Sequence, residues 1–373
     1  MNRLITFELE KILLHRKLVW AALAGFVLFM AIMQMNWVLP NGTYVQYMED
    51  GDFHIVRGQD AISYTKELAG KYAGPLTTEK VKDVLASGFW SRDEMIAANM
   101  DPESLRYFVH NALYDAFLGS FARPDGTYNG STVEEIYGPR ASELVIGYFS
   151  GWGSTMFSLS NLMLVWCCIV IIILSSIFSD EYTRGTDALI LSSIHGRTKC
   201  SLAKIIASFV VSIGGTVLII LALTLVMLLF HGTDGYEASV QINNIWFLST
   251  TPYPLSWLKA YFFACIFWIT AIIIVTAVTL LVSALAKSSF SSLVISLSIY
   301  LIPAFFPWNE FGLDYFGSFM PINQVMLNSF SLAEIPLGTY TLNLVWLTIP
   351  VSLILLVLCG LGSGKTFSGH QVE

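Results

Sequence analysis

The chain alternates long stretches without charged side chains with shorter stretches that are rich in them. No Asp, Glu, Lys or Arg occurs in six stretches, at residues 18–48, 144–179, 205–233, 260–286, 288–309 and 335–364. Each stretch can hold about 20 apolar residues in a helix, the length that crosses about 30 Å of hydrocarbon. We therefore predict six transmembrane helices, at residues 18–36, 157–178, 205–230, 260–283, 289–306 and 341–361.

The fifth predicted helix has an interrupted pattern, because Pro303 and Pro307 fall at its end. A membrane helix tolerates proline where neighbouring groups satisfy the freed carbonyl oxygens. The stretch 315–333 is also poor in charge, but it contains Asn323 and Gln324 among other polar residues. Its pattern fits a re-entrant or interfacial segment rather than a further span.

The segment 37–156, between the first two predicted spans, has mostly helical patterning. Apolar residues recur at helical spacing over 60–72, and Gly74 and Pro75 would end that helix. Thr77 offers a cap for the next helix, and Asp101-Pro102 is a strong helix start. The predicted fold class is thus an all-α membrane protein with a mostly helical domain between spans one and two.

Composition agrees with a membrane protein, since 55% of the residues are hydrophobic and 13% are charged, against about 25% charged in an average soluble chain. The first apolar run is long and lacks a small-residue cleavage pattern, so we expect an uncleaved span. The five cysteines lie in or beside predicted spans and imply no disulfide framework. Aromatic residues before the second span, Tyr148, Phe149 and Trp152, suit a membrane interface.

Lysine and arginine residues gather at alternate ends of the predicted spans. The N-terminal segment and the 179–204 loop carry four each, whereas 231–257 and 307–340 carry none. The positive-inside rule therefore places both termini in the cytoplasm and domain 37–156 outside the cell. That domain holds nine basic and sixteen acidic residues, which accounts for the whole net charge of −7. An acidic outer domain could attract cationic peptides, although ordinary solubility explains the charge more simply.

The residues Gly364-Lys365-Thr366 match the end of a nucleotide-binding P-loop, but Cys359 stands where the first glycine is required. We interpret 362–373 as a small-residue cytoplasmic tail with Lys365 as a flanking cation. No predicted span contains a confidently buried charge, which argues against an ion-coupled carrier. No histidine metal pair or G-x-S-x-G motif occurs. We therefore expect no enzyme and no cofactor or metal bound by this chain.

Two predicted cytoplasmic elements carry more information. The first is residues 1–17, where a helical arrangement separates apolar from polar side chains. The apolar side comprises Leu4, Ile5, Leu9, Ile12 and Leu13, and the residues assigned elsewhere are Glu8, Lys11 and Lys17. This pattern fits an amphipathic helix in the membrane interface, and a cytoplasmic extension of the first span fits nearly as well.

The second element is the segment Phe178 to Lys204, which we call the coupling segment. Its apolar block 188–191 is flanked by charges at Arg184, Asp187, Arg197 and Lys199. An apolar helix bounded by charges is typical of a docking element for another protein. The alternative is that the block packs beneath the spans.

The motif Phe178-x-x-Glu181-x-x-x-Gly185-Thr186, followed by the apolar block, Arg197 and Lys204, resembles the coupling segment of type-2 ABC-transporter permeases. The opening FELEKILLHRK, the six spans and the broken fifth span are also similar to that family. The family often has proline near the end of the block, where this chain has Ile194-His195. The large outer domain resembles that of a Gram-positive branch.

The resemblance implies a permease subunit of an ABC exporter in the plasma membrane, working as a homodimer or heterodimer with a separate ATPase subunit. The exported substrate would be a peptide, antibiotic or lipid, and no nucleic-acid partner is expected. The residues that would dock the ATPase are Glu181, Arg184, Gly185, Thr186, Leu189, Leu191, Arg197 and Lys199. Gly185-Thr186 would form the bend and cap that start a coupling helix, and Glu181 would pair with the partner or with a neighbouring helix. The alternative function is a membrane sensor or assembly factor with the outer domain as receptor.

Overall fold

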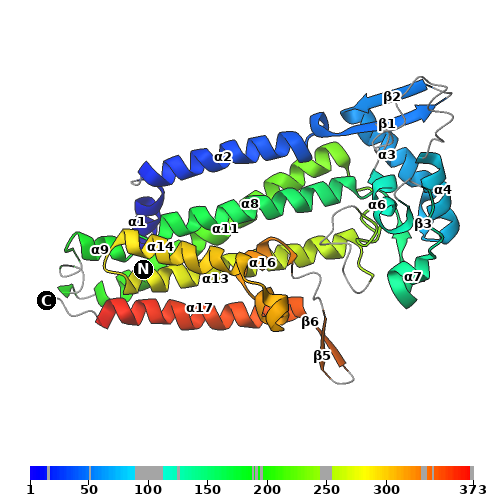
Figure 1. Cartoon of the computed structure of the whole chain (residues 1–373). Coiled ribbons are helices and arrows are strands. Elements are labelled where there is room, and N and C mark those ends of the chain that lie inside the picture. Colours follow the sequence, from blue (N-terminus) through cyan, green and yellow to red (C-terminus); the bar gives the residue numbers. More distant parts are fainter. Residues whose placement is uncertain are drawn as a thin grey trace. The chain divides into compact units, whose positions relative to one another are not determined.

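The computed structural model describes residues 1–14, 17–49, 52–88, 112–123, 127–186, 189, 192–193, 196–243, 254–328, 334–337 and 340–369 (Figure 1). The helices of ten or more residues are α1 (Asn2–Leu13), α2 (Lys17–Trp37), α3 (Gln59–Tyr72), α4 (Thr78–Gly88), α6 (Ala112–Phe121), α8 (Ser150–Leu174), α11 (Ser201–His231), α13 (Trp257–Leu285), α14 (Ser289–Leu301) and α17 (Leu344–Gly369). Shorter helical pieces are η1 (Pro40–Gly42), α7 (Val133–Tyr137), η3 (Gly138–Glu143), α9 (Ser179–Thr183), η4 (Gly196–Cys200), η5 (Ile302–Phe305), η6 (Trp308–Phe311), α15 (Asp314–Ser318) and α16 (Pro321–Val325). The described strands form antiparallel pairs: β1 (Tyr44–Glu49) with β2 (Asp52–Arg57), β3 (Gly74–Pro75) with β4 (Val145–Ile146), and β5 (Glu334–Leu337) with β6 (Tyr340–Asn343).

Apolar helices dominate the described part of the chain and confirm an all-α membrane protein. Five of them are long and apolar enough to cross a membrane, at Lys17–Gln34, Ser150–Thr183, Thr198–His231, Trp257–Leu285 and Trp346–Phe367. Each overlaps a predicted span, but the bounds differ. Helix α8 begins at Ser150 rather than 157, and α17 begins at Leu344 rather than 341, since residues 341–343 belong to β6.

The remaining predicted span, 289–306, is shorter in the structure. Helix α14 has 13 residues, which is about 20 Å of helix against about 30 Å of hydrocarbon. Pro303 lies in the 3₁₀ turn η5 that follows, where it lacks the N–H needed to continue an α-helix. The count of six full-length spans is therefore not reproduced among the described residues, and the interruption lies where the prolines predicted it.

The predicted tail 362–373 is also different in the structure, because α17 continues through Gly369. Gly364, Lys365 and Thr366 are helical, so they do not form the loop that precedes a helix in a phosphate-binding site. The glycines that suggested a tail allow close packing instead. A Cβ atom at Gly362 would lie 3.3 Å from Leu281 of α13.

The chain divides into two compact units. Unit 1 comprises Met1–Ala31, Leu159–Ala222 and Phe263–Glu373, and unit 2 comprises Ile32–Ser158 and Leu223–Phe262. Within unit 2, α3 and α4 agree with the predicted helices, and the Lys80 N–H donates to Thr77 Oγ1 at 3.3 Å as the predicted cap requires. The predicted helix start at Asp101 lies outside the described residues. The hairpin β1–β2 was not predicted.

The aromatic residues in and just before the first turn of α8 are buried within unit 2, so their rings face protein groups in this chain. Tyr148, Phe149 and Trp152 are each about 5% exposed or less. The Tyr148 hydroxyl lies 2.6 Å from Nδ1 of His231, and the Trp152 indole donates to the Asp234 carbonyl at 3.1 Å. These polar ends are satisfied by protein groups, which explains how the rings can be buried.

The core of unit 1 contains a buried stripe on α11 formed by Lys204, Ser208, Ser212 and Thr216, spaced four residues apart. The three hydroxyls each donate to the backbone carbonyl four residues earlier, at 2.8, 2.6 and 2.9 Å. The Trp166 indole of α8 donates to Thr216 Oγ1 at 3.0 Å. Four-residue spacing keeps these side chains on one helix face, and that face is in the core.

Candidate functional site

Helix α1 buries an acidic residue on its apolar side. Glu8 and Ile12 are its two buried side chains, one helical turn apart. The prediction that Glu8 lies away from the apolar side of this helix is wrong. At 100° per residue, Glu8 falls between Leu4 and Ile12 around the helix axis. The sequence alone therefore shows that an acidic residue interrupts the apolar stripe.

Glu8 belongs to a cluster of four charged side chains from α1, α9 and α11, all within unit 1, which we call the ionic cluster. The Lys204 ammonium lies 3.0 Å and 3.1 Å from the two Glu8 carboxylate oxygens and 2.6 Å from Oε1 of Glu181. Lys11 lies 3.4 Å from the same Glu181 oxygen. In Figure 1, α1 accordingly lies beside α9. Two carboxylates and two ammonium groups balance in charge.

Burial makes this cluster sensitive to the loss of any member. Lys204, Glu8 and Glu181 are 1%, 5% and 4% exposed, while Lys11 is 34% exposed at the edge. Burial lowers the pKa of Lys11, and the nearby Lys204 ammonium lowers it further. Glu181 and Lys204 are buried in the apolar helices Ser150–Thr183 and Thr198–His231, just beyond the predicted bounds 157–178 and 205–230.

Neighbouring helices hold α9 by polar contacts. The Ser283 hydroxyl of α13 accepts hydrogen bonds from the Phe178 and Ser179 N–H groups at 3.1 and 3.3 Å. The Tyr182 hydroxyl donates to the Ala284 carbonyl at 3.1 Å. Ser289 of α14 donates to Asp180 at 2.7 Å. This short helix is therefore fixed at both ends by α13 and α14.

The end of α17 packs against the same short helix. Phe367 is fully buried, and its ring centroid lies 5.0 Å from that of Phe178 and 5.8 Å from that of Tyr182. Aromatic pairs at such separations stabilise beyond the burial of their area. The start of the coupling segment thus contacts helices from both ends of the sequence.

Gly185 ends α9 and turns the chain away from it. Its φ is 63°, a left-handed conformation that favours glycine. The Gly185 N–H donates to the Tyr182 carbonyl at 3.2 Å, and the Thr186 N–H donates to the Glu181 carbonyl at 3.0 Å. This is the hydrogen-bond pattern of a Schellman motif, with Gly185 as the left-handed residue after the helix. The predicted bend is therefore present, but it caps the helix before it.

The predicted docking residues separate into buried and exposed groups. Glu181 is paired within the chain, so of its two predicted roles the structure shows the contact with neighbouring helices. Arg184 is exposed and lies 3.5 Å from Asp180, while Leu189 is 74% exposed and Lys199 is exposed. Of the two other members, Leu191 lies outside the described residues, and Arg197 belongs to the π-turn η4.

Among the described residues, no three His, Cys, Asp or Glu side chains are arranged to hold a metal ion. The apolar helices and the ionic cluster between them define a multi-pass helical membrane protein. A family model described as "ABC-2 family transporter protein" matches residues 8–358. The chain therefore belongs to the ABC-2 family, whose members are membrane components of ABC transport systems. No curated protein matches the chain.

Proposed function

We propose that this chain is the permease subunit of an ABC exporter and couples ATP hydrolysis on a separate ATPase subunit to movement of its own helices. The observation that carries the proposal is the family match over residues 8–358. The substrate would be a peptide, antibiotic or lipid. Two permease chains, identical or different, would assemble with the ATPase subunits in the plasma membrane, with both termini in the cytoplasm and 37–156 outside.

The ionic cluster supports this proposal, because it joins the start of the coupling segment to two other helices. A displacement of the exposed residues that follow Gly185 would move α9. Because Glu181 of α9 pairs with Lys204 of α11 and Lys11 of α1, those helices would move with it. Arg184 and Leu189 are exposed and available to a partner surface. An exposed apolar side chain and an exposed arginine both suit a protein interface.

The first test is co-purification of the full chain with a candidate ATPase subunit, followed by reconstitution in proteoliposomes. We expect the ATPase to bind and its activity to rise with the exported compound. An isolated chain that hydrolyses ATP by itself, or an ATPase that never binds it, would contradict the proposal. The alternative function, a membrane sensor or assembly factor, requires no ATPase partner and is favoured by the second outcome.

The bend at Gly185 offers a sharper test of coupling. Among the described residues, no neighbouring atom lies within 4 Å of a Cβ atom placed there, so the Cβ atom itself meets only backbone strain. A β-branched residue at this φ costs about 1–2 kcal/mol, whereas asparagine tolerates it. We expect Gly185→Val to fold and bind the ATPase but to export more slowly per ATP hydrolysed. Gly185→Asn is the matched control and should keep coupling, and equal export by both variants would count against the proposed role.

A further inference from the structure

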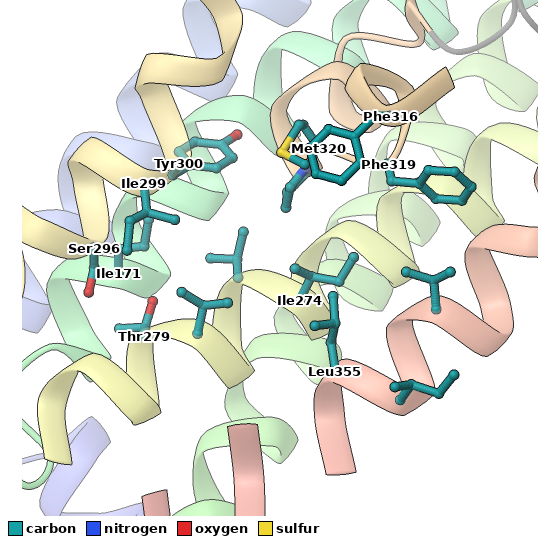
Figure 2. Close-up of a pocket in the computed structure, with 15 residues that line it drawn as sticks. Ile171, Ile274, Thr279, Ser296, Ile299, Tyr300, Phe316, Phe319, Met320 and Leu355 are labelled. Atoms are coloured by element: carbon teal, nitrogen blue, oxygen red, sulfur yellow. The ribbon is translucent and has the colours of Figure 1, made fainter. Parts of the chain in front are cut away.

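Unit 1 contains a partly open cavity of about 500 Å³ that the proposed coupling route does not use (Figure 2). Helices α8, α13, α14, α15, α16 and α17 all contribute to its walls. This volume lies within the range of about 300–1,000 Å³ typical of small-ligand sites.

The chemistry of the walls restricts the ligand. The only polar side chains among the fifteen lining residues are the hydroxyls of Thr279, Ser296 and Tyr300, and none is charged. Burying a charged or strongly polar ligand among such walls would cost several kcal/mol. The walls therefore select hydrocarbon.

The cavity runs from a buried floor to an exposed rim. Val275, Thr279 and Ser296 on its floor are at most 4% exposed. Ile299, Phe316 and Ile354, which also line it, are 48–58% exposed. Two of these rim residues belong to the apolar helices α14 and α17, so the mouth opens on an apolar surface. A molecule dissolved in bilayer hydrocarbon can reach that mouth without crossing water.

The interruption of α14 explains why the space exists. Where a full-length helix would continue, α16 returns beside the middle of α13 instead. The Trp268 indole donates to the Val325 carbonyl at 3.2 Å, and Thr270 donates to Gln324 at 3.1 Å. Val278, in the wall, lies seven residues before the α13 terminus at Leu285, or about 10 Å along the helix. The cavity thus lies within the length of an apolar helix that is long enough to cross a membrane.

We propose that this cavity binds one acyl chain of a bilayer phospholipid, which enters sideways between α14 and α17. The apolar walls receive the chain, and the headgroup stays outside the rim formed by Ile299, Phe316 and Ile354.

The test uses the full chain in vesicles of phosphatidylcholine that contains a photoreactive diazirine in one acyl chain. After irradiation, adducts are mapped by peptide mass spectrometry. We expect adducts on Val275 and Thr279, although both are buried, and none on Ala277 and Leu280, which are equally buried on α13 but do not line the cavity. Exposed Leu218 of α11 reports labelling from the bulk bilayer. Equal labelling of lining and non-lining buried residues would overturn the proposal.

Substitutions sharpen the test. Val278→Phe should lower labelling of Val275 and Thr279 about tenfold, because the added ring displaces about two methylene groups. Val282→Phe, one turn further along α13 and outside the cavity, is the control. Ser296→Ala should leave labelling unchanged, since an alkyl chain accepts no hydrogen bond. If Val278→Phe fails to fold, the contrast between lining and non-lining residues in the unmodified chain still decides.

A second arm of the experiment identifies the kind of lipid that supplies the bound acyl chain. The same experiment is run with a diazirine-bearing free fatty acid in unlabelled vesicles. Labelling by the phospholipid probe supports the proposal whether or not the fatty acid also labels. Labelling by the fatty acid alone, or loss of labelling in Ser296→Ala, would contradict a bilayer phospholipid as the occupant.

Discussion

The two ends of the buried stripe on α11 stabilise polar groups in different ways. At one end, Lys204 is neutralised by Glu8 and Glu181 from two other helices. Further along, Ser208, Ser212 and Thr216 donate to carbonyls of α11 itself. The charged end therefore depends on α1 and α9 being in place, whereas the hydroxyl end largely satisfies itself. We conclude that the ionic cluster specifies the contact of α11 with α1 and α9. The hydroxyl end is compatible with helix packing but does not specify a partner helix.

The largest expected effect comes from breaking the charged end with Lys204→Met. Glu8 and Glu181 would then face each other as buried carboxylates, and losing one partner of a buried ion pair typically costs about 3–5 kcal/mol. We expect a clear fall in the melting temperature of the purified protein in detergent. Lys17→Met, which removes an exposed cation at the start of α2, should leave the melting temperature unchanged.

A triple substitution separates lost charge balance from lost packing. Changing Glu8, Glu181 and Lys204 together to methionine removes the buried charges, and such replacements are often neutral or stabilising. We expect the triple variant to recover most of the stability that Lys204→Met loses. A triple variant as unstable as the single one would show that packing, and not unpaired charge, caused the loss.

An intermediate effect is expected where α8 and α11 pack most closely. A methyl group at Gly215 would lie 2.6 Å from Cη2 of Trp166, so Gly215→Ala must displace that ring. Overpacking of this kind costs about 1–3 kcal/mol. An added Cβ at the adjacent Gly214 meets no atom within 4 Å from other elements of the described structure, so Gly214→Ala should be neutral or slightly stabilising. Similar melting temperatures for the two variants would refute the close contact.

The smallest effect is expected at the hydroxyl end. Ser212 donates to Ser208 and accepts from Thr276 of α13 at 2.8 Å. In Ser212→Ala, Thr276 loses its acceptor but no charge is exposed, so the cost is about 0.5–1.5 kcal/mol. A loss as large as that of Lys204→Met, measured by the same thermal unfolding, would remove the distinction between the two ends.

Much of the fold was predictable because it rests on composition over long windows. Charge-free stretches identified the spanning helices, and Pro303 and Pro307 identified the interruption after α14. The hairpin β1–β2 was missed because the residue pattern of these two short strands was not distinguished from that of a loop. The helical end of α17 was missed because glycine and serine signal flexibility in water, although they also allow helices to approach closely in a membrane.

The ionic cluster was missed for a different reason. Glu8 and Lys204 are 196 residues apart in sequence, and no local pattern links them. Two weak signals existed: an acid within the apolar side of α1, and a lysine four residues before Ser208 on a stripe of buried hydroxyls. Each signal alone is compatible with an exposed charge at a helix end, and only the tertiary contact makes them a pair.

The packing of Phe367 has a practical consequence for altering the chain. The sequence predicted a small-residue tail over 362–373, the kind of segment that is trimmed or fused to a tag, but residues 362–369 are helical. Removing this segment would remove the Phe367 ring, which packs on Phe178 and Tyr182. Helix α9, to which Tyr182 belongs, also pairs through Glu181 with Lys11 and Lys204. Shortening the C-terminus would therefore weaken the packing of α9, which is contacted by α1 near the beginning of the sequence and by α17 near its end. A fusion partner is better placed after Gly369 than before it.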